Sequence, residues 1–202
     1  MKIGIMGGTF DPIHKGHLML GEYAYKQFEL DKIWFMPNGT PPHKEHSNIG
    51  SYAKDRMEMV KRAIAECEYF ELQPYEILNT EVNYSYKTME HFNSVYPKDE
   101  FYFIIGADSL FAIENWRLPE RLLKTCTILA AHRDDKSTDE MIKQIAYLNQ
   151  KYEANIHLLN SPNVDVSSSE IRSKLRNKES VSELIPETVL QYILENQLYK
   201  DE

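Results

Sequence analysis

Short apolar runs alternate along the chain with longer amphipathic stretches. An apolar run of about four to eight residues, bounded by turn residues, is typical of a strand that is buried on both faces of a sheet. On this basis strands are predicted at Lys2–Met6, Lys32–Met36, Tyr69–Leu72, Phe101–Ile105, Thr127–Ala131 and Ile156–Leu159. Gly7-Gly8 after the first run predicts a turn, and Pro37-Asn38-Gly39 ends the second run.

Between these runs, apolar residues recur three and four positions apart, which predicts helices. The first helix begins near Gly16, and a second, Tyr52–Glu66, carries an apolar stripe of Met57, Val60, Ile64 and Cys67. Further helices are predicted at Ser85–Tyr96, Thr138–Asn149, Ser168–Arg176 and Glu187–Glu195. Strands that alternate with helices indicate an α/β protein. We therefore predict a Rossmann-like open sheet, mostly parallel, with helices on both faces.

Composition favours one domain spanning residues 1–202. Apolar residues make up 42% of the chain, enough for a sizeable core, and there is no internal repeat, low-complexity segment or Gly/Ser linker. No apolar run approaches the length of a membrane span, and MKIGIMGGTF becomes polar too early for a signal peptide. The two cysteines, Cys67 and Cys126, lack a CxxC spacing, which predicts a cytoplasmic protein without a disulfide scaffold or a cysteine-based zinc site.

The formal net charge of −8 argues against general nucleic-acid binding, because an acidic surface repels a phosphate backbone. A small phosphorylated ligand can still bind where hydrogen-bond donors and positive groups gather locally. A phosphate site in this protein is therefore expected to be confined to a short stretch of the chain.

The stretch GGTFDPIHKGH, Gly7–His17, follows the first predicted strand and precedes the first predicted helix. Ligands of open α/β sheets bind at such places, because helix N-termini there present free N–H groups that attract anions. Neither the GxGxxG pattern nor the Walker-A pattern fits these residues. His14 and His17 can instead face one ligand and donate N–H groups to its phosphate oxygens, more strongly when protonated. Gly16 between them allows the helix start to lie close to a nucleotide.

GGTFDPIHKGH resembles the nucleotide-binding signature of the nucleotidyltransferase superfamily with the (T/H)xGH motif, and within it the nicotinate-mononucleotide adenylyltransferases of bacteria. Similar stretches follow in the order in which that family has them. They are Pro42-His43-Lys44, Gly106-Ala107-Asp108-Ser109, Trp116 with Leu118-Pro119, and the VSSSEIR stretch Val166–Arg172. GGTFDPIHKGH and VSSSEIR are the most specific of these motifs.

The resemblance implies the nucleotidyltransferase fold and one reaction in NAD biosynthesis. The AMP moiety of ATP is transferred to the 5′-phosphate of nicotinate mononucleotide, which gives deamido-NAD and pyrophosphate. Attack is in line, without a covalent enzyme intermediate. Mg²⁺ is the implied cofactor, held mainly by the ATP phosphates, so no residue is expected to be a metal ligand. A homodimer is common in the family, and neither nucleic acid nor membrane is an implied partner.

The resemblance also implies site residues. The expected catalytic residues are His14, His17 and Lys44. The residues expected to contact ATP are Gly7, Gly8, Thr9, Phe10, His14, Gly16, His17, Gly106, Asp108, Arg133, Ser168, Ser169 and Arg172. The residues expected to contact nicotinate mononucleotide are Thr9, Lys44, Ser85, Tyr86 and Trp116, of which Trp116 would stack on the nicotinate ring.

One stretch departs from the family pattern. Where the family usually has Ser-Tyr-Thr, this chain has Ser85-Tyr86-Lys87. Lys87 either helps to bind the nicotinate carboxylate or points to solvent. The departure concerns recognition of the acceptor rather than the adenylyl chemistry.

The VSSSEIR stretch can also be interpreted without the family. Ser167 with Glu170 three positions later fits a capping box, so a helix begins here and its N-terminus forms a second anion site. Arg172 in the first turns adds a planar fork of donors. Two such helix N-termini with basic side chains would let a protein of net charge −8 bind ATP.

Several of these residues have a structural alternative. Ser167–Ser169 would then only cap a helix, as would Asp108, while Trp116 would be a core aromatic. Arg133 would pair with Asp134 or Asp135, and Lys44 would be a surface lysine. His43 and His46, three positions apart, form either a metal site or part of a solvated loop.

Rival functions also stay open. An adenylyltransferase acting on phosphopantetheine is disfavoured, because that family has Thr at the position of His14, and nicotinamide mononucleotide is an alternative acceptor. An aminoacyl-tRNA synthetase-like module would need a KMSKS-like loop and an RNA-binding surface, and neither is visible. A non-catalytic nucleotide-binding protein is disfavoured by the intact set of His14, His17, Ser168 and Arg172.

Overall fold

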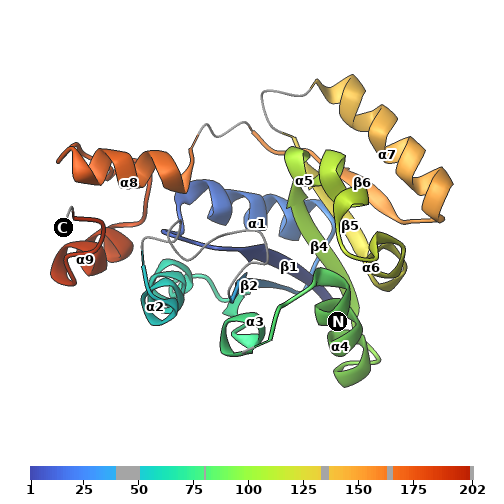
Figure 1. Ribbon diagram of the computed structural model, residues 1–202, viewed down its shortest axis with the longest axis horizontal. Coiled ribbons are helices and arrows are strands. Elements are labelled where there is room, and N and C mark those ends of the chain that lie inside the picture. Colours follow the sequence, from blue (N-terminus) through green and yellow to red (C-terminus); the bar gives the residue numbers. More distant parts are fainter. Residues whose placement is uncertain (40–50, 80, 133–136, 163–165, 201–202) are drawn as a thin grey trace. The chain divides into compact units, whose positions relative to one another are not determined.

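A computed structural model of the chain describes residues 1–39, 51–79, 81–132, 137–162 and 166–200 (Figure 1). The predicted strands are confirmed, with ends shifted by a few residues at most. The strands are β1 (Lys2–Gly8), β2 (Lys32–Pro37), β3 (Phe70–Leu72), β4 (Glu100–Gly106), β5 (Thr127–Ala131) and β6 (Ile156–Leu159). Gly7 and Gly8 continue β1 instead of turning, because the carbonyl of Gly8 accepts a hydrogen bond from the Asn38 N–H at 2.8 Å.

The predicted helices are confirmed as well. They are α1 (Lys15–Gln27), α2 (Ala53–Ile64), α4 (Ser85–Val95), α7 (Thr138–Tyr152), α8 (Ser168–Arg176) and α9 (Glu187–Glu195). The sequence did not predict the short elements α3 (Tyr75–Leu78), α5 (Ala107–Ala112), the 3₁₀ turn η2 (Ile113–Asn115) and α6 (Pro119–Thr125). Each of them is at most two turns long, too short for an apolar repeat to show.

The strands form one open sheet in the order β3-β2-β1-β4-β5-β6. β1 pairs with β4, β4 with β5 and β5 with β6, in each case in parallel. The sequence order reverses between β1 and β4, which is the switch point at which ligands bind in sheets of this kind. Met6 lies opposite Ile104, so β1 and β4 end side by side at the same edge of the sheet.

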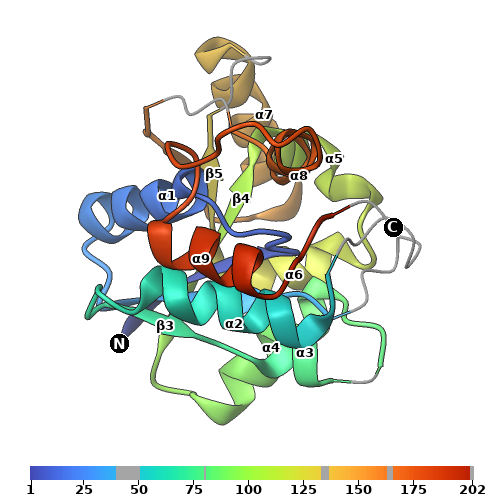
Figure 2. The ribbon, with the colours of Figure 1, turned by 90° about the vertical axis from the view of Figure 1, so that its left-hand side faces the viewer.

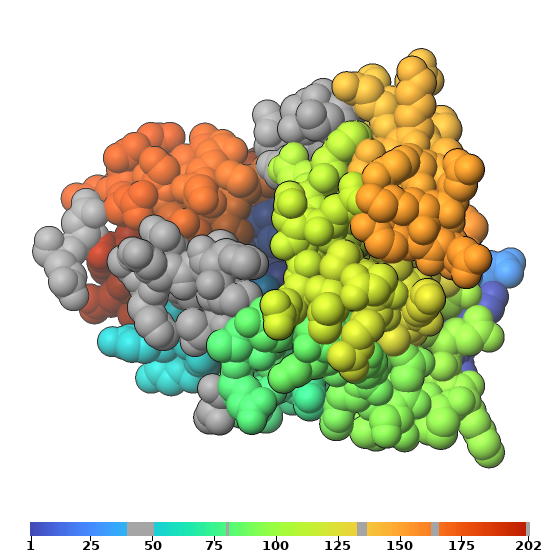
Figure 3. All heavy atoms as spheres, turned by 45° about the vertical axis from the view of Figure 1, so that its right-hand side comes forward, coloured from blue at the N-terminus to red at the C-terminus, as the bar shows by residue number. Residues whose placement is uncertain are grey.

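The described chain divides into two compact units, each made of three stretches. The first unit consists of Met1–Gly7, Leu20–Trp34 and Tyr84–Val164. Trp34 lies at the centre of an aromatic cluster there, with ring centroids 5.4 Å from Phe92 and 5.9 Å from Phe101. Figure 3 shows α7 in orange against the yellow-green surface of α5 and η2. Glu114 of η2 fastens this contact, because its Oε1 accepts hydrogen bonds from Lys151 and Tyr152 of α7 at 2.6 and 2.8 Å.

The second unit consists of Gly8–Met19, Phe35–Asn83 and Asp165–Glu202. In it α2 and α9 lie side by side (Figure 2). The hydroxyl of Tyr192 donates to the buried carboxylate of Asp55 at 2.9 Å. Val60 and Ile64 of α2 are buried as predicted, but Met59 is fully buried in place of Met57, which is only half-buried. The prediction that residues 1–202 form a single domain stays a prediction.

No helix in the described stretches of the chain is both long enough and apolar enough to cross a membrane.

Candidate active site

Within the first unit, the predicted site residues begin where β1 and β4 end. Gly7 follows Met6 of β1, and Gly106 closes β4 and caps the first turn of α5. A Cβ added to Gly106 would meet no atom within 4 Å, so its backbone borders open space. Asp108 is exposed in the first turn of α5. It is not the helix N-cap, so this structural alternative for Asp108 is wrong.

Three of the residues predicted to contact the mononucleotide, Ser85, Tyr86 and Trp116, lie in two short segments of the same unit. Trp116 follows η2, is half-buried, and meets Phe103 of β4 edge to face with ring centroids 6.5 Å apart. Ser85 and Tyr86 open α4; Ser85 is half-buried, whereas the buried Tyr86 ring lies 4.7 Å beneath the guanidinium of Arg121. The side chain of Tyr86 is thus buried in packing contacts, whereas Trp116 and Ser85 are partly exposed and can contact a ligand.

Within the second unit, the stretch from Gly8 to His14, which we call the signature loop, has an unusual backbone. Phe10 has φ of 51°, the left-handed region that residues with a side chain avoid. Its ring is 1% exposed and packs against Phe35 and His17, with centroids 6.0 and 5.0 Å apart. A Cβ on Gly8 would lie 3.1 Å from this ring. Phe10 can therefore meet a nucleotide only through its backbone in this conformation.

The two signature histidines lie on one another. Their ring centroids are 3.6 Å apart with 24° between the planes, and Nδ1 of His17 accepts a hydrogen bond from the backbone N–H of His14 at 3.2 Å. Because Nδ1 is an acceptor, the neutral His17 ring carries its proton on Nε2 and can donate it outward. Burial, followed by the proximity of His14, holds the pKa of His17 well below its usual value of 6.5. The lowered pKa favours a neutral His17 ring at pH 7, which donates through Nε2–H as an uncharged group.

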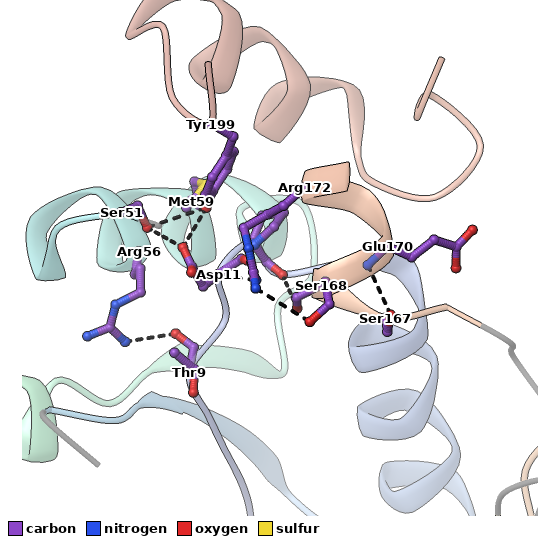
Figure 4. Close-up of polar contacts among 12 residues, drawn as sticks. Thr9, Asp11, Ser51, Arg56, Met59, Ser167, Ser168, Glu170, Arg172 and Tyr199 are labelled. Atoms are coloured by element: carbon purple, nitrogen blue, oxygen red, sulfur yellow. Dashed lines mark hydrogen bonds and ion pairs between the residues drawn. The ribbon is translucent and has the colours of Figure 1, made fainter. Parts of the chain in front are cut away.

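The start of α8 is bonded to the signature loop (Figure 4). Ser168 donates from Oγ to the Pro12 carbonyl at 2.9 Å, and Arg172 donates from Nη1 to the Asp11 carbonyl at 2.7 Å. Ser167 caps α8 by accepting the Glu170 N–H at 3.1 Å, which is one arm of the predicted capping box. These two bonds hold the first turns of α8 against the loop that precedes α1.

A buried arginine braces the other side of the signature loop. Arg56 of α2 is 3% exposed, and its Nη1 donates to the carbonyls of Thr9 and Asn38 at 2.8 and 2.9 Å. Burial lowers the pKa of Arg56 below its usual 12.5, an effect that the nearby Asp11 carboxylate opposes. The guanidinium stays charged and adds positive potential beside Thr9.

Four residues that the sequence analysis considered lie outside the described residues. They are His43, Lys44, His46 and Arg133. Among the residues that the structure does describe, no group of three or more His, Cys, Asp or Glu side chains is placed to hold a metal ion. The donors around the signature loop are imidazole, guanidinium and hydroxyl groups, which suit phosphate oxygens.

Residues 5–174 match the family described as cytidylyltransferase-like. The chain belongs to this family. It is 44% identical over 201 residues to a "Probable nicotinate-nucleotide adenylyltransferase" of Clostridium botulinum (strain Alaska E43 / Type E3), covering 100% of this chain and 99% of the relative. A relative of the same description from Clostridium novyi (strain NT) is 39% identical and covers 98% and 99%. The resemblance drawn from the motifs is thereby confirmed.

Solved structures share the fold. A Plasmodium falciparum nicotinic acid mononucleotide adenylyltransferase complexed with NaAD superposes with a TM-score of 0.80 at 22% identity, over 98% of this chain and 97% of that one. The same protein complexed with APC gives 0.78, also at 22% identity. These likenesses confirm the nucleotidyltransferase fold for this cytidylyltransferase-like protein.

The sequence analysis assigned no role to three residues that lie at the signature loop, namely Asp11, Arg56 and Tyr199. Asp11 is part of the recognised motif, and Tyr199 lies 188 positions further along the chain. Arg56 could have been found, because it shares the apolar face of α2 with Val60, four positions later. A charged residue on such a face is buried only with partners.

Proposed function

We propose that this protein transfers the adenylyl group of ATP to the 5′-phosphate of nicotinate mononucleotide. A phosphate oxygen of the acceptor attacks the α-phosphorus of ATP in line, forming one P–O bond. The bond from that phosphorus to the oxygen that bridges to the β-phosphorus breaks, and pyrophosphate leaves with the electron pair. The products are deamido-NAD and pyrophosphate, with no bond to the protein at any point.

The observation that carries the proposal is the assembly around the signature loop. Two imidazoles stack 3.6 Å apart, and Arg172 and Ser168 are held on the carbonyls of Asp11 and Pro12. Such fixed donors stabilise negative charge on phosphate oxygens better in the transition state than water does, because they need no reorganisation. The names of relatives at 39% and 44% identity support the same reaction.

The residues expected to hold ATP are the glycines of the β1 end, the two histidines, and the start of α8. His17 would donate from Nε2 to a phosphate oxygen, and Arg172 would add donors of its guanidinium. Mg²⁺ would be held mainly by the ATP phosphates, in keeping with the cationic and neutral donors of the loop. When bound, it would neutralise charge on the phosphates. Trp116 and Ser85 are expected at the nicotinate. Lys87, exposed in the first turn of α4, would either bind the nicotinate carboxylate or point to solvent.

The acceptor decides between this function and its rivals. We would measure pyrophosphate release from ATP and Mg²⁺ with nicotinate mononucleotide, nicotinamide mononucleotide and phosphopantetheine in parallel. The proposal predicts that kcat/KM is highest for nicotinate mononucleotide. Dominance of either other acceptor would refute the assigned substrate and retain adenylyl transfer, and no release with any of the three would refute catalysis.

A further inference from the structure

The buried carboxylate of Asp11 is the meeting point of three segments of the second unit. Asp11 is 2% exposed. Its Oδ1 accepts hydrogen bonds from Ser51 Oγ at 2.5 Å and from the Tyr199 hydroxyl at 2.8 Å (Figure 4). Its Oδ2 lies 3.6 Å from Nη1 of Arg172. One side chain of the signature loop is thus joined to Ser51, two residues before α2, to Arg172 of α8, and to Tyr199 after α9.

Tyr199 is a permanent donor in this cluster. It is 8% exposed, and burial, followed by the charge of Asp11, raises the pKa of its phenol far above the usual value. The hydroxyl also lies 3.3 Å from Ser51 Oγ and 3.9 Å from the sulfur of Met59. A phenylalanine ring would occupy the same space, so the particular contribution of the tyrosine is the bond from its hydroxyl to Asp11.

The position of Asp11 in the chain explains why this bond matters for a ligand. Asp11 directly follows Phe10, whose left-handed backbone is unfavourable for a residue with a Cβ and persists only where the surroundings hold it. His14 is three residues further on, and the carbonyl of Asp11 is the acceptor of Arg172. Fixing Asp11 therefore fixes the turn that precedes the histidines and the guanidinium that faces it.

We propose that Tyr199 is a positioning residue for ATP: through Asp11 it holds the signature loop and Arg172 in the conformation that binds the phosphates. This inference rests on the proposed function, since it takes ATP as the ligand of the loop. When a binding-competent conformer becomes less populated, the apparent dissociation constant rises by the same factor, while the bound complex is unchanged. Loss of the hydroxyl should thus weaken ATP binding and leave kcat nearly intact.

The test compares Tyr199→Phe with Tyr192→Phe. Tyr192 makes the same kind of bond, hydroxyl to buried carboxylate at 2.9 Å, but its acceptor is Asp55 of α2 and not a residue of the signature loop. ATP affinity is measured by titration calorimetry with ATP and Mg²⁺ alone, and steady-state kinetics follow with nicotinate mononucleotide. Tyr199→Phe is expected to raise the dissociation constant and KM for ATP about 3- to 10-fold, the size of effect that the net loss of one ordinary hydrogen bond allows. The kcat and the KM for the mononucleotide are expected to change less than about twofold, and Tyr192→Phe to bind ATP normally.

An unchanged ATP affinity in Tyr199→Phe would overturn the inference, and so would an equal loss of ATP affinity in Tyr192→Phe. In either case the bond from Tyr199 to Asp11 would contribute only to the stability of the fold. If Tyr199→Phe does not fold, Ser51→Ala, which removes the other hydroxyl donor to Oδ1, decides by the same criterion. A wild type that binds ATP but does not adenylylate nicotinate mononucleotide would refute the proposed function and leave this comparison decisive. A wild type that does not bind ATP would overturn both.

Discussion

The imidazole of His14 stacks on that of His17 with ring centroids 3.6 Å apart. The contact places two donors on one side of the helix start. Burial, followed by the proximity of His14, lowers the pKa of His17, so its ring is neutral. The backbone bond to Nδ1 of His17 then leaves the Nε2–H as the group that can reach a phosphate oxygen.

His17→Ala is expected to lower kcat by about 100-fold or more, because removal of one charge-stabilising donor commonly has an effect of about that size. The kcat is measured at saturating ATP and nicotinate mononucleotide. His157→Ala is the matched control, since His157 is an exposed histidine of β6 in the first unit. A near-normal kcat in His17→Ala would contradict the role of this residue.

The hydrogen bond from the His14 backbone N–H to Nδ1 of His17 predicts which replacement of His17 retains activity. A glutamine amide N–H takes the place of the imidazole Nε2–H, whereas an asparagine amide takes the place of Nδ1. His17→Gln should therefore keep a larger share of kcat than His17→Asn. The reverse order would mean that the backbone contact of Nδ1, rather than the outward donor, matters for catalysis.

The depressed pKa of His17 links protonation to stability. Because the folded state disfavours the charged ring, the unfolded chain binds the proton more readily, and stability rises with pH in this range. The contribution is complete above the unfolded pKa of 6.5 and is lost progressively as the pH falls below that value. Between pH 7.5 and 5.5, the free energy of unfolding should fall by about 1 kcal/mol more in the wild type than in His17→Gln. The free energy of unfolding of both proteins is measured by urea denaturation at each pH. The same pH dependence in both proteins would rule out the depressed pKa of His17.

Gly8 and Gly106 should respond differently to a methyl group. At Gly8 the added Cβ would press on the buried Phe10 ring at 3.1 Å, whereas at Gly106 it would meet no atom within 4 Å. Overpacking costs about 1–3 kcal/mol, and the loss of glycine entropy from the unfolded chain offsets about 0.4–1 kcal/mol of it. Gly8→Ala should therefore lower the free energy of unfolding by about 1 kcal/mol, and Gly106→Ala should leave it within about 0.5 kcal/mol.

The Gly106 variant also tests the predicted nucleotide contact. If ATP approaches this backbone, Gly106→Ala should raise the KM for ATP several-fold although the protein remains as stable as the wild type. A normal KM in a stable Gly106→Ala protein would remove Gly106 from the ATP site. Urea denaturation and steady-state kinetics on the same preparations give both values.

Arg172→Lys should weaken ATP binding about 10-fold, although the charge is kept. The guanidinium of Arg172 reaches the Asp11 carbonyl and Ser169 Oγ at 2.7 and 3.4 Å, and a lysine ammonium has no planar fork to serve a phosphate at the same time. Arg176→Lys, an exposed change at the end of α8, is the control. Equal KM values for ATP in the two variants would contradict a direct role of Arg172.

Local patterns were enough to predict the sheet and the longer helices. β6 and α9, for example, have the bounds that the apolar pattern predicts. A buried strand shows as a continuous apolar run and a helix as an apolar repeat, and both patterns can be recognised from residues that are close in sequence. The short helices α3 and α6 carry too few residues for such a repeat. Gly7-Gly8 were expected to turn, and they extend β1 because a partner from another strand end holds them.

Only those residues of the candidate site that belong to a sequence motif could be predicted. His14, His17, Ser168 and Arg172 stand in recognisable stretches, and the structure brings all four to the signature loop in the second unit. The bond from Tyr199 to Asp11 joins positions 188 apart, and no local pattern encodes such a contact. For Arg56, burial on the apolar face of α2 was predictable, but its partners were not, because they are backbone carbonyls that any residue would supply.

The fate of the α-phosphate tests the central claim most directly. ATP labelled at the α-phosphorus is incubated with nicotinate mononucleotide, Mg²⁺ and the wild-type protein, and the products are separated. Adenylyl transfer predicts that the label appears in deamido-NAD, while label from the γ-phosphorus appears in pyrophosphate. Transfer of γ-label to the mononucleotide, or release of inorganic phosphate without any dinucleotide, would contradict the account.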